Sequence, residues 1–139
     1  MKDYGATILR ATVGAIYVMQ AYLALFVSAP RGTASFIAKL GLPTPTFLTL
    51  LVIVVHGAGG AMLVLGLWTR LAAWANAVVL LVGILTVYLR QGVPLKGAFV
   101  DAAVGRATPA GYEYVLLLVA ATVAVALGSS GASAISRSK

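Results

Sequence analysis

Very few side chains in this sequence are able to do chemistry. Its 139 residues include one histidine, three acidic residues and no cysteine. The lack of cysteine excludes disulfides, thiolate nucleophiles and iron–sulfur ligation. One histidine and three carboxylates cannot assemble a metal site of ordinary ligand spacing within one chain. We therefore predict no metal site, and a bound metal would need a second copy or a partner.

The single histidine is the first candidate for function. His56 lies inside a long apolar run, where an ionisable side chain is costly unless it faces the interior of a helix bundle or a cavity. The helical rise places it about 15 Å into that run. Tyr17 and Thr122 reach a similar depth in their own runs, and Gln20 lies one turn from Tyr17. We expect these four side chains to form one polar layer.

Three interpretations of the imidazole remain open. It either closes a hydrogen bond between helices, to a carbonyl or to Tyr17, or it donates to the carbonyl of a bound quinone. An imidazole beside a tyrosine in an apolar bundle is what a quinone head needs. The third interpretation is axial ligation of haem, with Met19 or Met62 opposite His56.

Two charged residues stand at the ends of apolar runs. Glu113 opens the last run, where a carboxylate complements the positive end of a helix and can pair with Arg90, Lys96 or Arg106. The alternative is a route that brings protons to a buried site. Arg10 belongs to the opposite face of the membrane, where we expect it to snorkel or to bind lipid phosphate, a structural role.

The elements that must position these side chains are long apolar runs. The sequence is 61% hydrophobic and 9% charged, so a soluble fold of this size has no means of hiding its apolar surface. A helix needs about 20 apolar residues to cross a hydrocarbon core about 30 Å thick. Four apolar runs are present, at about residues 7–27, 46–67, 71–89 and 112–127, and the last of them is short. We predict one domain over residues 1–139, an all-α integral membrane four-helix bundle with both termini on one side.

The connection after the first run predicts a fifth, shorter helix. Its apolar residues share one helical face: Phe36, Ile37 and Leu40. Thr33 is placed to cap the start, and Gly41 ends the pattern. We interpret residues 33–40 as an interfacial helix, with a linker packed over the helix ends as the alternative.

The connection between the second and third runs is only Trp68, Thr69 and Arg70. So short a turn predicts an antiparallel hairpin, and Trp68 and Trp74 on either side of Arg70 are typical of an aromatic belt at the headgroups. The Lys and Arg residues divide equally between the two faces, so they do not predict the orientation of the bundle.

Glycines cluster after the histidine, in the run HGAGGA. Gly57, Gly60 and Ala61 recur at spacings of three and four, which lets a neighbouring helix backbone approach closely. The alternative use of these small residues is room for a flat ring or a lipid tail beside the backbone.

Four segments together carry a family resemblance: LRATVG from Leu9, FIAKLGLP from Phe36, HGAGGAMLVLGLWTR from His56, and GYEYVLLL from Gly111. With these motifs the chain resembles the DoxX family. The resemblance implies a four-helix bundle in the inner (plasma) membrane of a prokaryote, related to small subunits of thiosulfate:quinone oxidoreductase. The residues that match the family are Arg10, Gly14, Gly60, Arg70 and Glu113.

Two positions depart from the family. Ala24 stands where members commonly have lysine, and His56 stands where they have glutamate, so a redox role of those residues does not carry over unchanged. We expect first a subunit that anchors or completes a larger membrane-associated redox complex. The alternatives are a quinone-binding subunit supplied with electrons by a partner, without a covalently bound cofactor, and a small transporter or lipid-binding protein.

The expected partners follow from the same features. Membrane lipids surround the bundle, and another protein subunit or a second copy completes it. The net charge of +7 comes from scattered basic residues without an aromatic-flanked patch, so we expect no nucleic acid partner.

Overall fold

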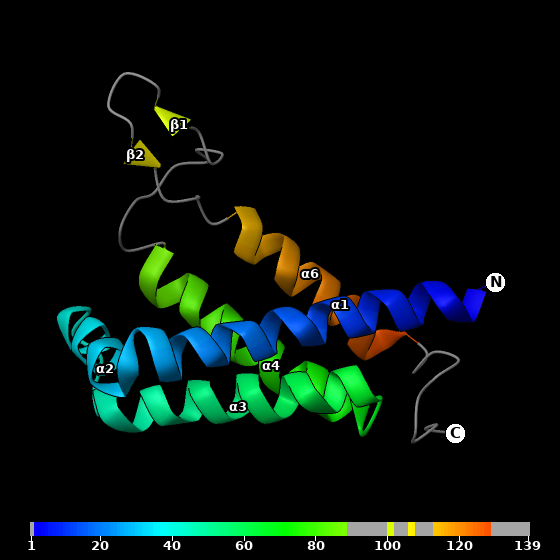
Figure 1. Cartoon of the computed structure of the whole chain (residues 1–139), viewed down its shortest axis with the longest axis horizontal. Coiled ribbons are helices and arrows are strands. Elements are labelled where there is room, and N and C mark those ends of the chain that lie inside the picture. Colours follow the sequence, from blue (N-terminus) through cyan, green and yellow to red (C-terminus); the bar gives the residue numbers. More distant parts are fainter. Residues whose placement is uncertain (1, 89–99, 102–105, 108–112, 129–139) are drawn as a thin grey trace.

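A computed structural model of the chain describes residues 2–88, 100–101, 106–107 and 113–128 (Figure 1). The described elements follow in chain order: α1 Lys2–Tyr22, the π-helical turn η1 Leu23–Val27, α2 Ala29–Lys39, α3 Pro45–Leu65, α4 Thr69–Gly83, the π-helical turn η2 Ile84–Tyr88, the strands β1 Val100–Asp101 and β2 Arg106–Ala107, and α6 Glu113–Leu127.

Each of the four long helices packs against two others. α1 contacts α3 and α6, and α4 contacts the same two helices from the other side. α1 and α3 run side by side in opposite directions, and α2 lies over the end that joins them (Figure 1). The core between the helices contains Val13, Leu63, Leu118 and Val125.

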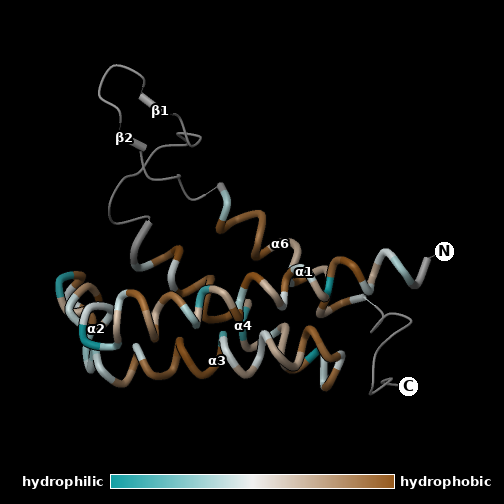
Figure 2. The backbone as a smooth tube through the Cα atoms, in the orientation of Figure 1, coloured by the Kyte–Doolittle hydropathy of each residue, from teal (hydrophilic) through white to brown (hydrophobic). Residues whose placement is uncertain are grey.

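Three of the described helices are long and apolar enough to cross a membrane: Tyr4–Val27, Pro45–Leu65 and Thr69–Thr86. Hydrophobic residues predominate along these helices (Figure 2), and large side chains such as Phe26, Val54 and Leu71 are exposed. The apolar helix Tyr114–Leu127 is shorter. The predicted membrane helices are thus supported, and the crossing of the membrane by the last helix stays a prediction.

The helix limits differ from the prediction where local backbone signals decide them. α1 already begins at Lys2. α3 ends at Leu65 because Gly66 adopts a left-handed conformation with φ 74°, and Leu67 N donates to Met62 O at 2.8 Å. α4 begins at Thr69, so Arg70 belongs to this helix, and its predicted place in the turn was wrong.

The helix predicted over residues 33–40 is present but longer. α2 starts at Ala29 with Pro30 in its first turn, so Thr33 lies inside the helix and its predicted capping role was wrong. The end was predicted correctly, with Gly41 at φ 71° after Lys39. Ile37 is half-buried, whereas Phe36 is 48% exposed and points away from the protein interior. The interfacial position of α2 stays a prediction.

The described elements are helical apart from one pair of two-residue strands, so the all-α prediction is confirmed. β1 and β2 pair antiparallel, with Val100 opposite Ala107. They belong to the connection before α6, for which the sequence analysis predicted no strand. The small, polar C-terminal tail, GSSGASAISRSK, predicts a frayed end, and its residues 129–139 lie outside the described residues.

Candidate functional site

Each of the four long helices contributes one buried side chain to a group of polar residues that contact one another. Tyr17 of α1, Asn76 of α4 and Thr122 of α6 are 0% exposed, and His56 of α3 is 5% exposed. Depth counted along the predicted helices correctly placed Tyr17, His56 and Thr122 in one layer. The observed layer contains Asn76 in place of the predicted Gln20, and from here on the polar layer means Tyr17, His56, Asn76 and Thr122.

One half of the polar layer connects α1 to α6. The hydroxyl of Thr122 donates to Leu118 O at 2.6 Å, which uses its single hydrogen. The oxygen atoms of Tyr17 and Thr122 are 2.7 Å apart, so the phenol must be the donor in this bond. The tyrosine O–H therefore has its acceptor inside the protein.

The other half connects α3 to α4. The amide nitrogen of Asn76 donates to Ala72 O at 2.8 Å, because a carbonyl oxygen can only accept. The amide oxygen is then turned toward His56, and Asn76 Oδ1 lies 2.9 Å from His56 Nδ1. Nδ1 must carry the proton of this bond. In the neutral imidazole Nε2 is left as an acceptor, and it has no hydrogen-bond partner among the described residues.

The two halves meet at their rings. The centroids of the Tyr17 and His56 rings are 4.9 Å apart with an interplanar angle of 46°. This tilted contact is within the range in which aromatic rings attract one another. All four long helices are thus joined through the polar layer.

Glycines bring the helices close enough for these contacts. A Cβ atom at Gly59 would lie 2.4 Å from Asn76 Nδ2, so only glycine leaves room for the amide. A Cβ at Gly60 would lie 2.8 Å from Gly14 O, so α1 and α3 approach closely at these two glycines. The predicted packing role therefore holds for Gly60 but not for Ala61, which is exposed.

Sequence reasoning missed Asn76 and included Gln20. Gln20 is half-buried and makes no hydrogen bond to the polar layer within the part of the chain that the structure describes. Asn76 had a usable signal, because an amide in the middle of the apolar segment AAWANAVVLL needs a partner as much as a histidine does.

Arg10 does not reach the lipid headgroups. Its side chain is 1% exposed, and its guanidinium donates to the carbonyl oxygens of Leu63 and Val64 at the C-terminal end of α3. The snorkelling role predicted for it was wrong, because the end of α3 supplies carbonyls that lack partners in their own helix. Its role is structural, as a cap that one helix gives to another.

The remaining predicted site residues do not form a second centre. Met19 is exposed, and Met62 belongs to the same helix as His56, so neither supports haem ligation opposite the imidazole. The side chain of Glu113 lies outside what the structure describes, as do residues Arg90 and Lys96. The predicted ion pair of Glu113 therefore stays a prediction.

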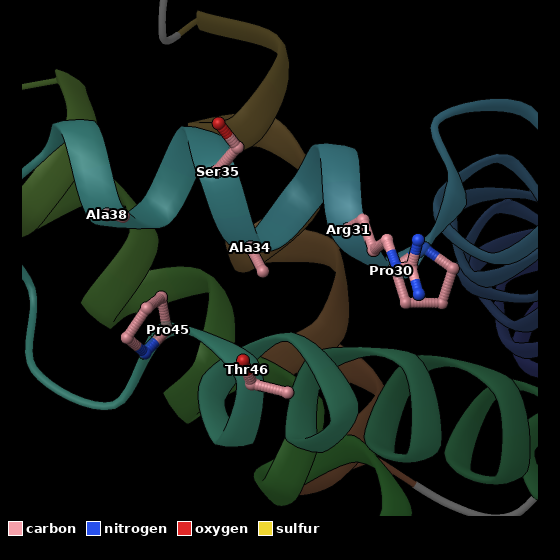
Figure 3. A pocket seen from close by; sticks show the side chains of 7 residues that line it. All are labelled: Pro30, Arg31, Ala34, Ser35, Ala38, Pro45 and Thr46. Atoms are coloured by element: carbon pink, nitrogen blue, oxygen red, sulfur yellow. The ribbon is translucent and has the colours of Figure 1, made fainter.

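A hollow of about 340 Å³ lies between α2 and the start of α3 (Figure 3). Its wall is mostly apolar, with Pro30, Ala34 and Pro45, and Arg31 stands at one end. It contains none of the polar-layer residues.

The comparisons with known proteins decide the family. The family model for DoxX matches residues 5–89, which is more than half of the chain. The chain belongs to the DoxX family. The DoxX match covers α1 to α4 and ends before α6, so it includes His56, Tyr17 and Asn76 but not Thr122. No curated protein and no solved structure was found to match this DoxX chain.

Proposed function

We propose that this DoxX protein is an integral membrane subunit that anchors or completes a larger membrane-associated redox complex. The observation that carries the proposal is the polar layer, whose four donor atoms each have an acceptor inside the chain. Hydrogen bonds of this kind hold membrane helices together. Because these donors are bonded to other helices or to their own helix, the polar layer stiffens the bundle, and a stiff bundle suits an anchor.

The membrane arrangement belongs to the proposal. α1, α3, α4 and α6 cross the plasma membrane of a prokaryote, and α2 lies in the interface. Support comes from the exposed apolar side chains of the long helices and from α2, where Arg31, Phe36 and Lys39 are all exposed. Basic residues beside an outward phenylalanine suit the boundary between headgroups and acyl chains.

The redox centre belongs to the partner. Among the described residues there is no group of three His, Cys, Asp or Glu side chains able to hold a metal ion, and the whole sequence has no cysteine. A chain of this kind contributes positioning and membrane attachment, while a partner carries the cofactor that transfers electrons.

Purification from native membranes in mild detergent tests this proposal. We expect the tagged chain to elute with a stoichiometric second protein that has flavin, haem or iron–sulfur absorption. A tagged membrane protein of similar size and different family, purified in parallel, is the control for non-specific capture. If the folded chain elutes alone, or only with copies of itself, the anchoring function is contradicted.

Quinone binding at the polar layer is the second candidate. The donation from His56 to a quinone carbonyl that the sequence suggests does not fit the geometry, because the Nδ1 proton is directed at Asn76. The observation that favours a site is Nε2 of His56, next to the Tyr17 ring, which has no hydrogen-bond partner among the described residues. A quinone that binds here should raise the melting temperature of the wild type and not that of His56→Ala. A wild-type melting temperature unchanged by quinone would exclude this candidate.

A further inference from the structure

We propose that the hollow between α2 and α3 binds one anionic phospholipid, with the lipid phosphate on Arg31 and part of an acyl chain against the apolar wall. The ligand class is a headgroup phosphate of net negative charge joined to a hydrocarbon chain. The site shares no residue with the polar layer. The direction from which the lipid enters rests on the proposed place of α2 in the membrane interface, whereas the hollow and its charge do not.

The side chains that form the hollow are too short or too rigid to fill it. On α2, Pro30, Ala34 and Ala38 recur every four residues and therefore share one face of the helix. Pro45 lies opposite them at the start of α3 (Figure 3). Alanine has no rotamer that swings inward and a proline ring is fixed, so side-chain motion does not close the space of about 340 Å³. Small-molecule sites have volumes of about 300–1,000 Å³, so the hollow is large enough to hold part of a ligand.

The polar groups of the hollow favour a negatively charged ligand. Arg31 stands at one end, is exposed, and forms no hydrogen bond or ion pair with any described residue. The sequence contains no acidic residue between Asp3 and Asp101, so every charged side chain on α2 and α3 is basic. Thr46 is in the first turn of α3, at the positive end of that helix, and its hydroxyl is able to donate to a phosphate oxygen. A guanidinium and a hydroxyl beside one hollow suit a phosphate group.

The apolar surfaces around the hollow favour a lipid over a soluble phosphate. Each element beside it exposes a large hydrophobic side chain: Phe26 on η1, Phe36 on α2 and Phe47 on α3. A free phosphate ion gains nothing from these side chains or from the apolar wall, whereas an acyl chain buries apolar surface on both sides of the contact. A cation at one end of an apolar hollow therefore matches a phospholipid, in which a charged headgroup adjoins hydrocarbon.

Binding to the wild type tests the charge preference without any variant. The chain is stripped of lipid in a non-ionic detergent and titrated with dioctanoyl phosphatidylglycerol, and separately with dioctanoyl phosphatidylcholine as the zwitterionic probe of equal chain length. Native mass spectrometry counts the bound molecules. We expect one phosphatidylglycerol per chain, bound at least about tenfold more tightly than phosphatidylcholine and not displaced by inorganic phosphate at constant ionic strength. Equal binding of the two lipids, or displacement by free phosphate, would overturn the ligand class.

A spin label tests the place of α2 separately from the lipid site. The chain has no cysteine, so Phe36→Cys accepts one label on the exposed side of α2, outside the hollow. In bilayers, a label more accessible to oxygen than to a water-soluble nickel complex supports α2 in the interface, and the reverse contradicts that arrangement and the direction of lipid entry. Loss of lipid binding in detergent would leave the anchoring function standing, because that function is judged by the co-purified partner.

Variants test whether the lipid lies in the hollow. Arg31→Gln removes the charge and Ala34→Leu fills the space, so each should weaken the binding of phosphatidylglycerol at least about tenfold. Lys39→Gln is the matched control for charge, because Lys39 is exposed on the same helix and does not line the hollow. Ala75→Leu, at an exposed position of α4, is the matched control for added volume. If Lys39→Gln weakened binding as much as Arg31→Gln, or if Ala34→Leu bound the lipid as the wild type does, the proposed site would be refuted.

Discussion

The substitution Gly60→Ala adds one methyl group and should push α1 and α3 slightly apart. The Cβ atom of Gly60→Ala would lie 2.8 Å from Gly14 O and 2.9 Å from Val18 N. Both neighbours are backbone atoms, so they are unable to rotate away as the end of a flexible side chain does. The same methyl would lie 2.9 Å from Tyr17 Cβ, which belongs to the polar layer.

The size of the effect follows from three contributions. Bringing the shortest contact from 2.8 Å to an ordinary 3.4 Å moves the helices apart by about 0.6 Å. Overpacking of this kind costs about 1–3 kcal/mol, while the higher helix propensity of alanine returns about 1 kcal/mol. The displaced tyrosine weakens a hydrogen bond between helices that is worth about 0.6 kcal/mol. We expect a net loss of about 0.6–2.6 kcal/mol in the free energy of unfolding.

The assay is reversible unfolding in mixed detergent micelles, followed by helical circular dichroism. Gly57→Ala is the matched control in the same helix, because its methyl fits at 3.4 Å from a side-chain atom and it gains the same propensity. We expect this control to be as stable as the wild type or more stable. If Gly60→Ala were as stable as Gly57→Ala, the close approach of α1 and α3 at Gly14 would be refuted.

Three further variants test other contacts by the same assay. Tyr17→Phe removes the bond to the hydroxyl on α6 and should cost about 0.6–1.7 kcal/mol, whereas Tyr22→Phe at an exposed position should cost nothing measurable. Arg10→Met removes the cap at the end of α3 and should cost about 1.5–3 kcal/mol, while Arg31→Met on exposed α2 should leave stability unchanged. Ile37→Pro breaks a hydrogen bond inside α2 and should cost about 3 kcal/mol if that helix supports the bundle. An unchanged value for Tyr17→Phe, Arg10→Met or Ile37→Pro would refute the contact concerned.

Depth along a helix was predictable from the sequence, whereas the neighbours of a side chain were not. The regular rise of a helix placed Tyr17, His56 and Thr122 at one level, and the structure joins these three residues. The same count gave no information on which helices adjoin. Arg10 was therefore expected at the headgroups, although the end of α3 passes close enough to receive it.

The residues around Asn76 in the sequence gave no sign that it belongs to the polar layer. Asn76 is surrounded in the sequence by alanines and one tryptophan, so its amide looked like a minor interruption of an apolar run. Its importance appears only when Gly59 of another helix is seen to leave space for it. Helix starts were also hard to predict, because the N-cap residues of α2 and α4, Ser28 and Trp68, make no side-chain cap hydrogen bond.

The central claim is that four helices cross the membrane together, and reporter fusions test it most directly. Fusions at residue 3 and at residue 137 should report the same compartment, and an insertion at residue 42, between α2 and α3, should report the other. The compartment reported at residue 137 depends on whether the last helix crosses the membrane. This crossing has the least support from length alone, because Tyr114–Leu127 is the shortest of the four apolar helices. Opposite compartments for residues 3 and 137 would contradict the four-helix arrangement.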